Sequence, residues 1–95
     1  MLLRFTGEII YWRGPSPFYF VAVPPAECAQ LREASPEVSY GWGVIPVRGR
    51  LGDTEFTTSL FPKDGGYLVP VKARVRMAEQ VDVGDTVSLT LSLAD

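Results

Sequence analysis

The sequence predicts a mainly β fold, a small barrel that also contains two short helices. Three observations indicate this class: a strand of period two near the C-terminus, a hairpin whose turn and cross-strand pairs agree, and two segments opened by proline. A chain of 95 residues has room for one domain, residues 1–95. Its apolar content of 46% is enough to form a core, so disorder is not expected.

The clearest strand follows the turn residues Gly84 and Asp85. Apolar and hydroxyl side chains alternate after that turn: Val87, Leu89, Leu91 and Leu93 are interleaved with Thr86, Ser88, Thr90 and Ser92. A period of two is typical of a strand that buries one face and exposes the other.

A hairpin is predicted around Gly52 and Asp53, because glycine at the first of two loop positions favours a type II′ turn. This loop sets the register of the flanking strands. The predicted pairs are Leu51 with Thr54, Arg50 with Glu55, Gly49 with Phe56, Arg48 with Thr57, Val47 with Thr58 and Ile45 with Leu60. Every inward pair contains an apolar or small residue, and Arg50 faces an opposite charge, so the turn and the hydrophobic pattern agree.

Two further strands and two helices complete the prediction. A first strand is expected over residues 2–12, and residues 18–23 are apolar on both faces, as in a strand covered on both sides. Short helices are expected at about residues 25–34 and 71–79. The elements form two loosely similar halves, so one copy of the chain can close a barrel, and we expect a monomer.

Composition argues against several classes of function. The formal net charge is −2, from nine basic and eleven acidic residues, whereas a nucleic-acid coat needs a surplus of positive charge. Cys28 is the single cysteine, so an internal disulfide cannot form and an oxidising compartment is not indicated. No signal-peptide pattern or bilayer-spanning apolar run is found, and we expect a cytoplasmic protein.

The residues needed for common catalytic sites are missing. The sequence contains no histidine, which removes the commonest general base and the usual Ser-His and Cys-His pairs. A lone Cys28 cannot form a redox pair or a cysteine-based zinc site. We therefore expect a protein without catalytic activity and without a cofactor or metal, and an enzyme with an unfamiliar site is the less favoured alternative.

One segment is a candidate anion site, formed by two glycines and nearby cations. Its residues are Lys63, Gly65, Gly66, Lys72, Arg74 and Arg76. Glycine backbone N–H groups and a following helix can bind a phosphate, a nucleotide or an acidic partner. The alternative is that Asp64, Gly65 and Gly66 form only a hairpin turn and that the cations are solvated. This second interpretation is the commoner one for such a composition.

Aromatic residues form a second candidate site. Trp12, Tyr19 and Trp42, together with Phe18, are too many rings for a small domain to hide easily. They predict either an apolar contact surface for a ligand or partner, or part of the core beneath a helix. The sequence does not decide between these two alternatives.

Several motifs, in their order along the chain, resemble a known family. They are Phe5-Thr6-Gly7-Glu8, Gly41-Trp42-Gly43, Thr58-Ser59-Leu60-Phe61-Pro62, Asp64-Gly65-Gly66-Tyr67, Pro70-Val71-Lys72 and Gly84-Asp85-Thr86-Val87. Together they resemble the bacterial domain-of-unknown-function family 1905. The resemblance implies a small double-split β-barrel of about six strands with two short helices, distantly similar to AbrB-like and MazE-like barrels. It implies no activity.

The function expected from these observations is that of a binding module. Its ligand would be a small anion or a protein partner, held by the glycine-flanked cations and the aromatic residues. The runner-up is a nucleic-acid-associated regulator, which rests on fold analogy and on the local basic cluster. Nucleic acid is the less favoured partner, because the chain has no overall positive charge.

Overall fold

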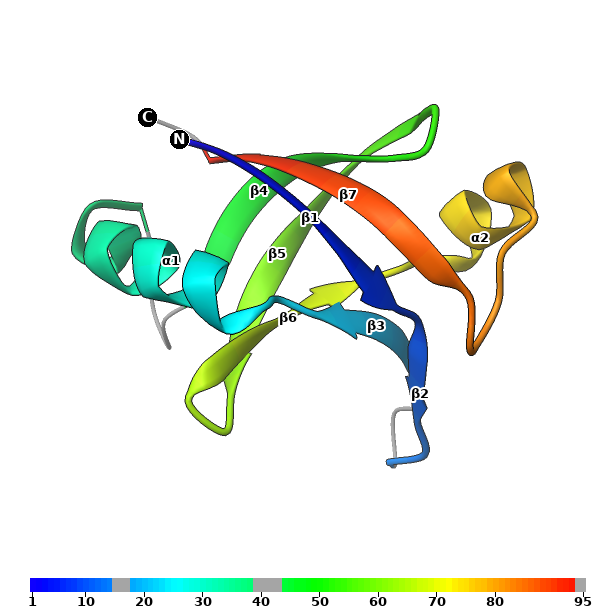
Figure 1. Cartoon of the computed structure of the whole chain (residues 1–95), viewed down its shortest axis with the longest axis horizontal. Coiled ribbons are helices and arrows are strands. Elements are labelled where there is room, and N and C mark those ends of the chain that lie inside the picture. Colours follow the sequence, from blue (N-terminus) through cyan, green and yellow to red (C-terminus); the bar gives the residue numbers. More distant parts are fainter. Residues whose placement is uncertain (15–17, 39–43, 94–95) are drawn as a thin grey trace.

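The computed structural model describes residues 1–14, 18–38 and 44–93 of the chain. Its strands are β1 (Leu2–Glu8), β2 (Ile10–Trp12), β3 (Phe18–Ala22), β4 (Ile45–Leu51), β5 (Thr54–Lys63), β6 (Gly66–Pro70) and β7 (Thr86–Leu93), and its helices are α1 (Pro25–Val38) and α2 (Ala73–Glu79). The strands form one sheet in the order β1-β7-β4-β5-β6-β3-β2. The sheet curls into a half-barrel, and the two helices lie at opposite ends of it (Figure 1).

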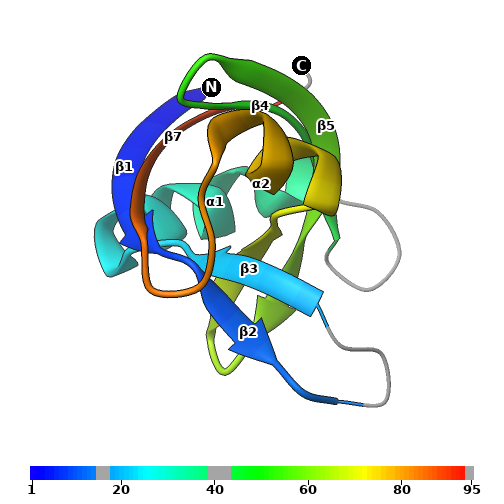
Figure 2. The ribbon, with the colours of Figure 1, turned by 90° about the vertical axis from the view of Figure 1, so that its right-hand side faces the viewer.

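The long strand β5 connects the two parts of the sheet. Residues 54–60 pair with β4, whereas residues 61–63 pair with β6. Because one strand changes partner along its length, the sheet curls around the core rather than remaining flat. Figure 2 shows this curl, with β1, β7, β4 and β5 above and β2 and β3 below.

The expected first strand, residues 2–12, is divided at Ile9. Its first part, β1, pairs with β7, and its second part, β2, pairs with β3 at the opposite edge of the sheet. The N–H of Ile9 donates to the carbonyl of Asp85 (3.0 Å), and the N–H of Gly84 donates to the carbonyl of Ile9 (2.9 Å). The turn before β7 therefore takes the hydrogen bonds that a continuous strand would need, and this break accounts for seven strands instead of about six.

Strands β1 and β3 lie close together at Gly7. A Cβ atom built on Gly7 would lie 2.5 Å from Cγ1 of Val21, which is closer than carbon atoms in contact can be. Val21 is completely buried. The absence of a side chain at position 7 therefore lets the two ends of the sheet come together over the core.

The core fills the inside of the half-barrel. Its fully buried side chains include Ile9, Val21, Leu31, Ile45, Leu60, Val69, Leu89 and Leu91. Cys28 and Leu31 of α1 cover one end of the sheet, and Val75 of α2 packs at the other. The predicted alternation is confirmed in β7, where residues 87, 89, 91 and 93 are buried.

The predicted β4–β5 register is confirmed in full. Leu51 pairs with Thr54, Arg50 with Glu55, Gly49 with Phe56, Arg48 with Thr57, Val47 with Thr58 and Ile45 with Leu60. Gly52 has a φ of +59°, and Asp53 does not adopt positive φ, which agrees with a type II′ rather than a type I′ turn.

Some boundaries differ from the prediction. Helix α1 continues to Val38 instead of ending at Ala34, and α2 begins at Ala73 rather than at Val71, with Lys72 as its N-cap. The outer face of β3 lies at the surface, so its rings are only half-buried. The mainly β class and the two helices are confirmed, whereas a double-split arrangement of about six strands is not confirmed.

Candidate functional site

The glycine-flanked segment forms the hairpin turn between β5 and β6. Asp64 and Gly65 both have positive φ, of 52° and 80°, and Lys63 pairs with Gly66 across the hairpin. Two such residues in sequence are typical of a type I′ turn. The guanidinium of Arg32 on α1 donates a hydrogen bond to the carbonyl of Gly65 (2.8 Å). The turn therefore presents a carbonyl to a cation, and the turn interpretation accounts for Gly65 and Gly66.

The side chain of Lys63 contacts an aromatic residue of β2. Its ammonium lies 4.1 Å from the ring centroid of Trp12, within the range of a cation–π contact. The Trp12 ring meets the Phe18 ring edge-to-face, with 5.3 Å between centroids. Phe18 in turn lies 5.4 Å from both Phe20 and Phe61. We call Trp12, Phe18, Phe20 and Phe61 the ring cluster.

The ring cluster is on the outer face of the sheet. Leu68, which pairs with Phe61, is buried in the same region, but Trp12 remains 42% exposed. Sequence reasoning identified Trp12 and Phe18 but missed Phe20 and Phe61. The pairing of β3 and β5 with the same strand, β6, brings these rings together, and that arrangement is not visible in the local sequence pattern.

Tyr19 faces the other side of β3 and packs partly against the core. The guanidinium carbon of Arg76 lies 3.5 Å from the centroid of the Tyr19 ring. Arg76 also donates a hydrogen bond to the carbonyl of Val71. Two contacts thus hold this arginine in place between α2 and β3.

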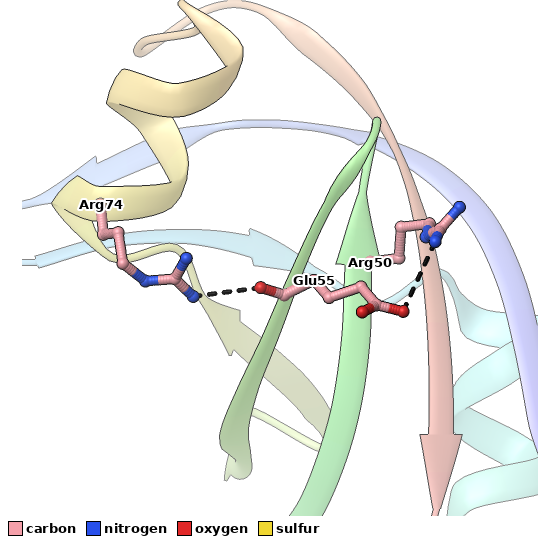
Figure 3. Close-up of polar contacts among 3 residues, drawn as sticks. All are labelled: Arg50, Glu55 and Arg74. Atoms are coloured by element: carbon pink, nitrogen blue, oxygen red, sulfur yellow. Dashed lines mark hydrogen bonds and ion pairs between the residues drawn. The ribbon is translucent and has the colours of Figure 1, made fainter.

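Arg74 points in a different direction from Arg76. Its guanidinium donates to the backbone carbonyl of Glu55 on β5 (3.1 Å). The carboxylate of the same Glu55 pairs with Arg50 on β4 (3.4 Å), so Glu55 lies between two arginines (Figure 3). Arg74 connects α2 to the β4–β5 hairpin and does not join the other predicted cations.

Lys72 is the N-cap residue of α2, and its side chain is exposed and makes no capping hydrogen bond. It lines a surface hollow of about 300 Å³, which we call the α2 hollow. The complete lining is Phe18, Tyr19, Pro70, Val71, Lys72, Ala73 and Arg76. Two aromatic residues and two cationic residues thus line one small volume.

The structure therefore divides the predicted site residues into separate places. Tyr19, Lys72 and Arg76 meet in the α2 hollow, and Lys63 and Trp12 are connected to it through Phe18. The β5–β6 turn holds Gly65 and Gly66, and Arg74 contacts Glu55. Trp42 lies outside the described residues.

The Cys28 thiol and the acidic residues were the candidates for metal ligands in the described part of the chain. The Cys28 thiol is buried and donates to the carbonyl of Val23 (3.2 Å). Within residues 1–14, 18–38 and 44–93, no three acidic or cysteine side chains are grouped so that they could hold a metal ion. None of the described helices has both the length and the apolar character required to cross a bilayer.

Comparison with known proteins places the chain in a family. A comparison with curated proteins finds no match. A family model described as a domain of unknown function, DUF1905, matches residues 5–91. The match covers nearly all of the fold, from β1 into β7. It also confirms the family resemblance that was inferred from the motifs and their order along the chain. The chain belongs to the DUF1905 family.

Proposed function

We propose that this domain is a non-catalytic binding module, and that it binds a small anionic ligand with a planar apolar part in the α2 hollow. The observation that carries the proposal is a concavity of about 300 Å³ that is lined by two aromatic and two cationic residues, Phe18 and Tyr19 with Lys72 and Arg76. Ligand sites commonly combine an apolar wall with a few convergent polar groups in a concavity of this size.

The two cations have different parts in this proposal. Arg76 is fixed by the Val71 carbonyl and by the Tyr19 ring, so little conformational entropy is lost when its remaining N–H groups bind an anion. The ammonium of Lys72 makes no hydrogen bond or ion pair with any described residue, and it is free to close over the ligand. Each charge-assisted hydrogen bond gained would contribute about 1.5–3 kcal/mol.

The aromatic wall favours a planar group over a simple anion. Phe18 lines the hollow and continues into the ring cluster, where Trp12 is 42% exposed and carries Lys63 over its face. A flat ligand that stacks on these rings removes apolar surface from water, whereas inorganic phosphate does not. Lys63 stands at the far side of this surface, where it would meet a second negative group.

An NMR titration tests this proposal with three probes. Adenosine monophosphate carries both a planar base and a phosphate, adenosine lacks the phosphate, and inorganic phosphate lacks the base. We expect the monophosphate to shift the amides of Tyr19, Val71 and Ala73 at millimolar concentration, and either partial probe to act more weakly. If all three leave these amides unmoved, or if the shifts gather at another surface, the proposal is wrong.

A further inference from the structure

The outer face of β1, β7, β4 and β5 brings Arg4 together with Arg48 and Arg50, which lie far from it in the sequence. One cross-strand row consists of Arg4, Thr90, Arg50 and Glu55, and the next consists of Leu2, Ser92, Arg48 and Thr57. Directly paired residues of antiparallel strands point to the same side of the sheet. The guanidiniums of Arg4, Arg48 and Arg50 therefore surround the hydroxyls of Thr90 and Ser92. We call this set the arginine face.

The charges on this face are not balanced. Arg50 pairs with Glu55 at 3.4 Å, but their side chains are 55% and 70% exposed, so water screens the pair. Arg4 and Arg48 make no hydrogen bond or ion pair within the described part of the chain. Glu8 shares the outer side of β1, but it lies about 14 Å along the strand from Arg4.

This concentration is unexpected for the composition. The chain has more acidic than basic residues, and opposite charges that face each other across two strands stabilise a sheet. Here Arg4 lies opposite Thr90, and Arg48 lies between Ser92 and Thr57, so hydroxyls occupy the positions where carboxylates would neutralise the arginines. Three cations near one carboxylate leave a local excess of positive charge.

The surface is also hollowed at this place. A depression of about 350 Å³ is lined by Leu2, Arg4, Arg48, Gly49, Arg50, Glu55, Thr90 and Ser92. An adjoining depression of similar volume shares Arg48 and Ser92 and adds Thr57 and Thr58. Guanidiniums and hydroxyls around a concavity are the donors that phosphate oxygens accept from, and arginine can bind a phosphate with two parallel hydrogen bonds.

We infer that the arginine face is a second binding site, separate from the α2 hollow, for a small ligand that carries several phosphate groups. Arg48 and Arg50 are about 7 Å apart along β4, and Arg4 and Arg50 are about 10 Å apart across β7. Flexible side chains at these distances can contact neighbouring phosphates of one ligand. The two rows contain no aromatic side chain on which a base could stack, so recognition rests on charge and hydroxyl contacts.

Isothermal titration calorimetry with inorganic tripolyphosphate tests the inference on the full chain. We expect binding that weakens as salt rises, and at least tenfold weaker binding of orthophosphate, which cannot reach all three arginines. Arg48→Gln should weaken tripolyphosphate binding about tenfold or more, because it removes the guanidinium of a residue that lines both depressions. Arg48→Lys should recover only part of the loss, since lysine keeps the charge but loses the fork of donors.

Arg13→Gln is the matched control, because it removes one exposed arginine that lines neither the arginine face nor the α2 hollow and follows β2, at the opposite edge of the sheet from β1. The inference predicts unchanged tripolyphosphate affinity for this variant. It is overturned if tripolyphosphate does not bind, or if Arg48→Gln and Arg13→Gln weaken binding equally, which would indicate diffuse attraction to surface charge. Displacement of tripolyphosphate by a single-stranded oligonucleotide that binds more tightly would also overturn it, in favour of a nucleic acid.

Discussion

The carboxylate of Glu79, in the last turn of α2, accepts a hydrogen bond from the hydroxyl of Thr54 at the start of β5. The same carboxylate accepts a second bond from the backbone N–H of Asp53 (3.3 Å). Glu79 thus connects the helix that lines the α2 hollow to the β4–β5 turn. Together with the bond from Arg74 to Glu55, it fixes α2 against the sheet.

Glu79→Ala should therefore destabilise the fold, by about 1–2 kcal/mol, because two hydrogen bonds to a charged acceptor are lost. Urea denaturation measures the change. Glu55→Ala is the matched control: it removes a carboxylate whose only side-chain contact among the described residues is the exposed pair with Arg50, and its effect should stay below about 0.5 kcal/mol. Equal effects of the two variants would contradict the role given to Glu79.

The carboxylate of Glu79 also occupies the space that a side chain at position 52 would need. The φ of Gly52, +59°, is unfavourable for other residues, and a Cβ at this position would lie 2.0 Å from Oε1 of Glu79. Gly52→Ala should cost about 1–2 kcal/mol, from backbone strain and from displacement of Glu79. Gly84 also has positive φ but has open space around it, so Gly84→Ala should cost only the strain.

A double-mutant cycle separates the two contributions at position 52. In a Glu79→Ala background the collision is gone, and Gly52→Ala should then cost about as much as Gly84→Ala. Both costs are read from the midpoints of urea unfolding. Additive effects of Gly52→Ala and Glu79→Ala would show that the turn and the helix are not coupled.

A substitution at Gly7 tests whether β1 and β3 are in contact over the core. Gly7→Ala places a methyl group against buried Val21 and should destabilise the fold by about 1–3 kcal/mol, as overpacking of a core does. In a Val21→Ala background, Gly7→Ala should cost less than it does in the unaltered domain, because the atom that the new methyl group strikes is gone. Thermal unfolding of both single variants and the double variant measures this; additive effects would mean that β1 and β3 do not meet there.

Features that depend on interactions between neighbouring residues were predicted correctly from the sequence, and features that depend on distant residues were not. The β4–β5 register and the alternation of β7 follow from turn chemistry and period two, which are local. The break at Ile9 depends on hydrogen bonds to Gly84 and Asp85, far along the chain. The local sequence pattern does not reveal such distant partners, so it predicts one continuous strand over residues 2–12.

The same reasoning applies to the site. Sequence grouped Lys63, Gly65, Gly66 and the cations of α2 because they are neighbours along the chain. The fold separates these residues, because successive residues of a strand or a helix point in different directions and contact different elements. Tyr19 and Arg76 come together only because β3 lies beside β6, from which the chain leads into α2. The arginine face likewise needs the order β1-β7-β4, which non-local pairing decides.

The oligomeric state remains a prediction, and we expect a monomer. One chain carries all seven strands of the curled sheet, so no strand from a partner is needed to cover the core. Light scattering at micromolar concentration should give the mass of one chain. A stable dimer would contradict this, and Trp12→Ser, which removes an exposed ring at the edge strand β2, would show whether that edge forms the contact.

The most direct test of the proposed function compares two cations of one helix region. Lys72 lines the α2 hollow, whereas Arg74, two residues along the chain, points to Glu55. Calorimetric titration with adenosine monophosphate should show about tenfold or greater weakening in Lys72→Ala, because a charge-assisted contact is lost, and little change in Arg74→Ala. Equal affinities of the two variants, or no binding by the unaltered domain at millimolar ligand, would contradict the assignment of the α2 hollow as the binding site.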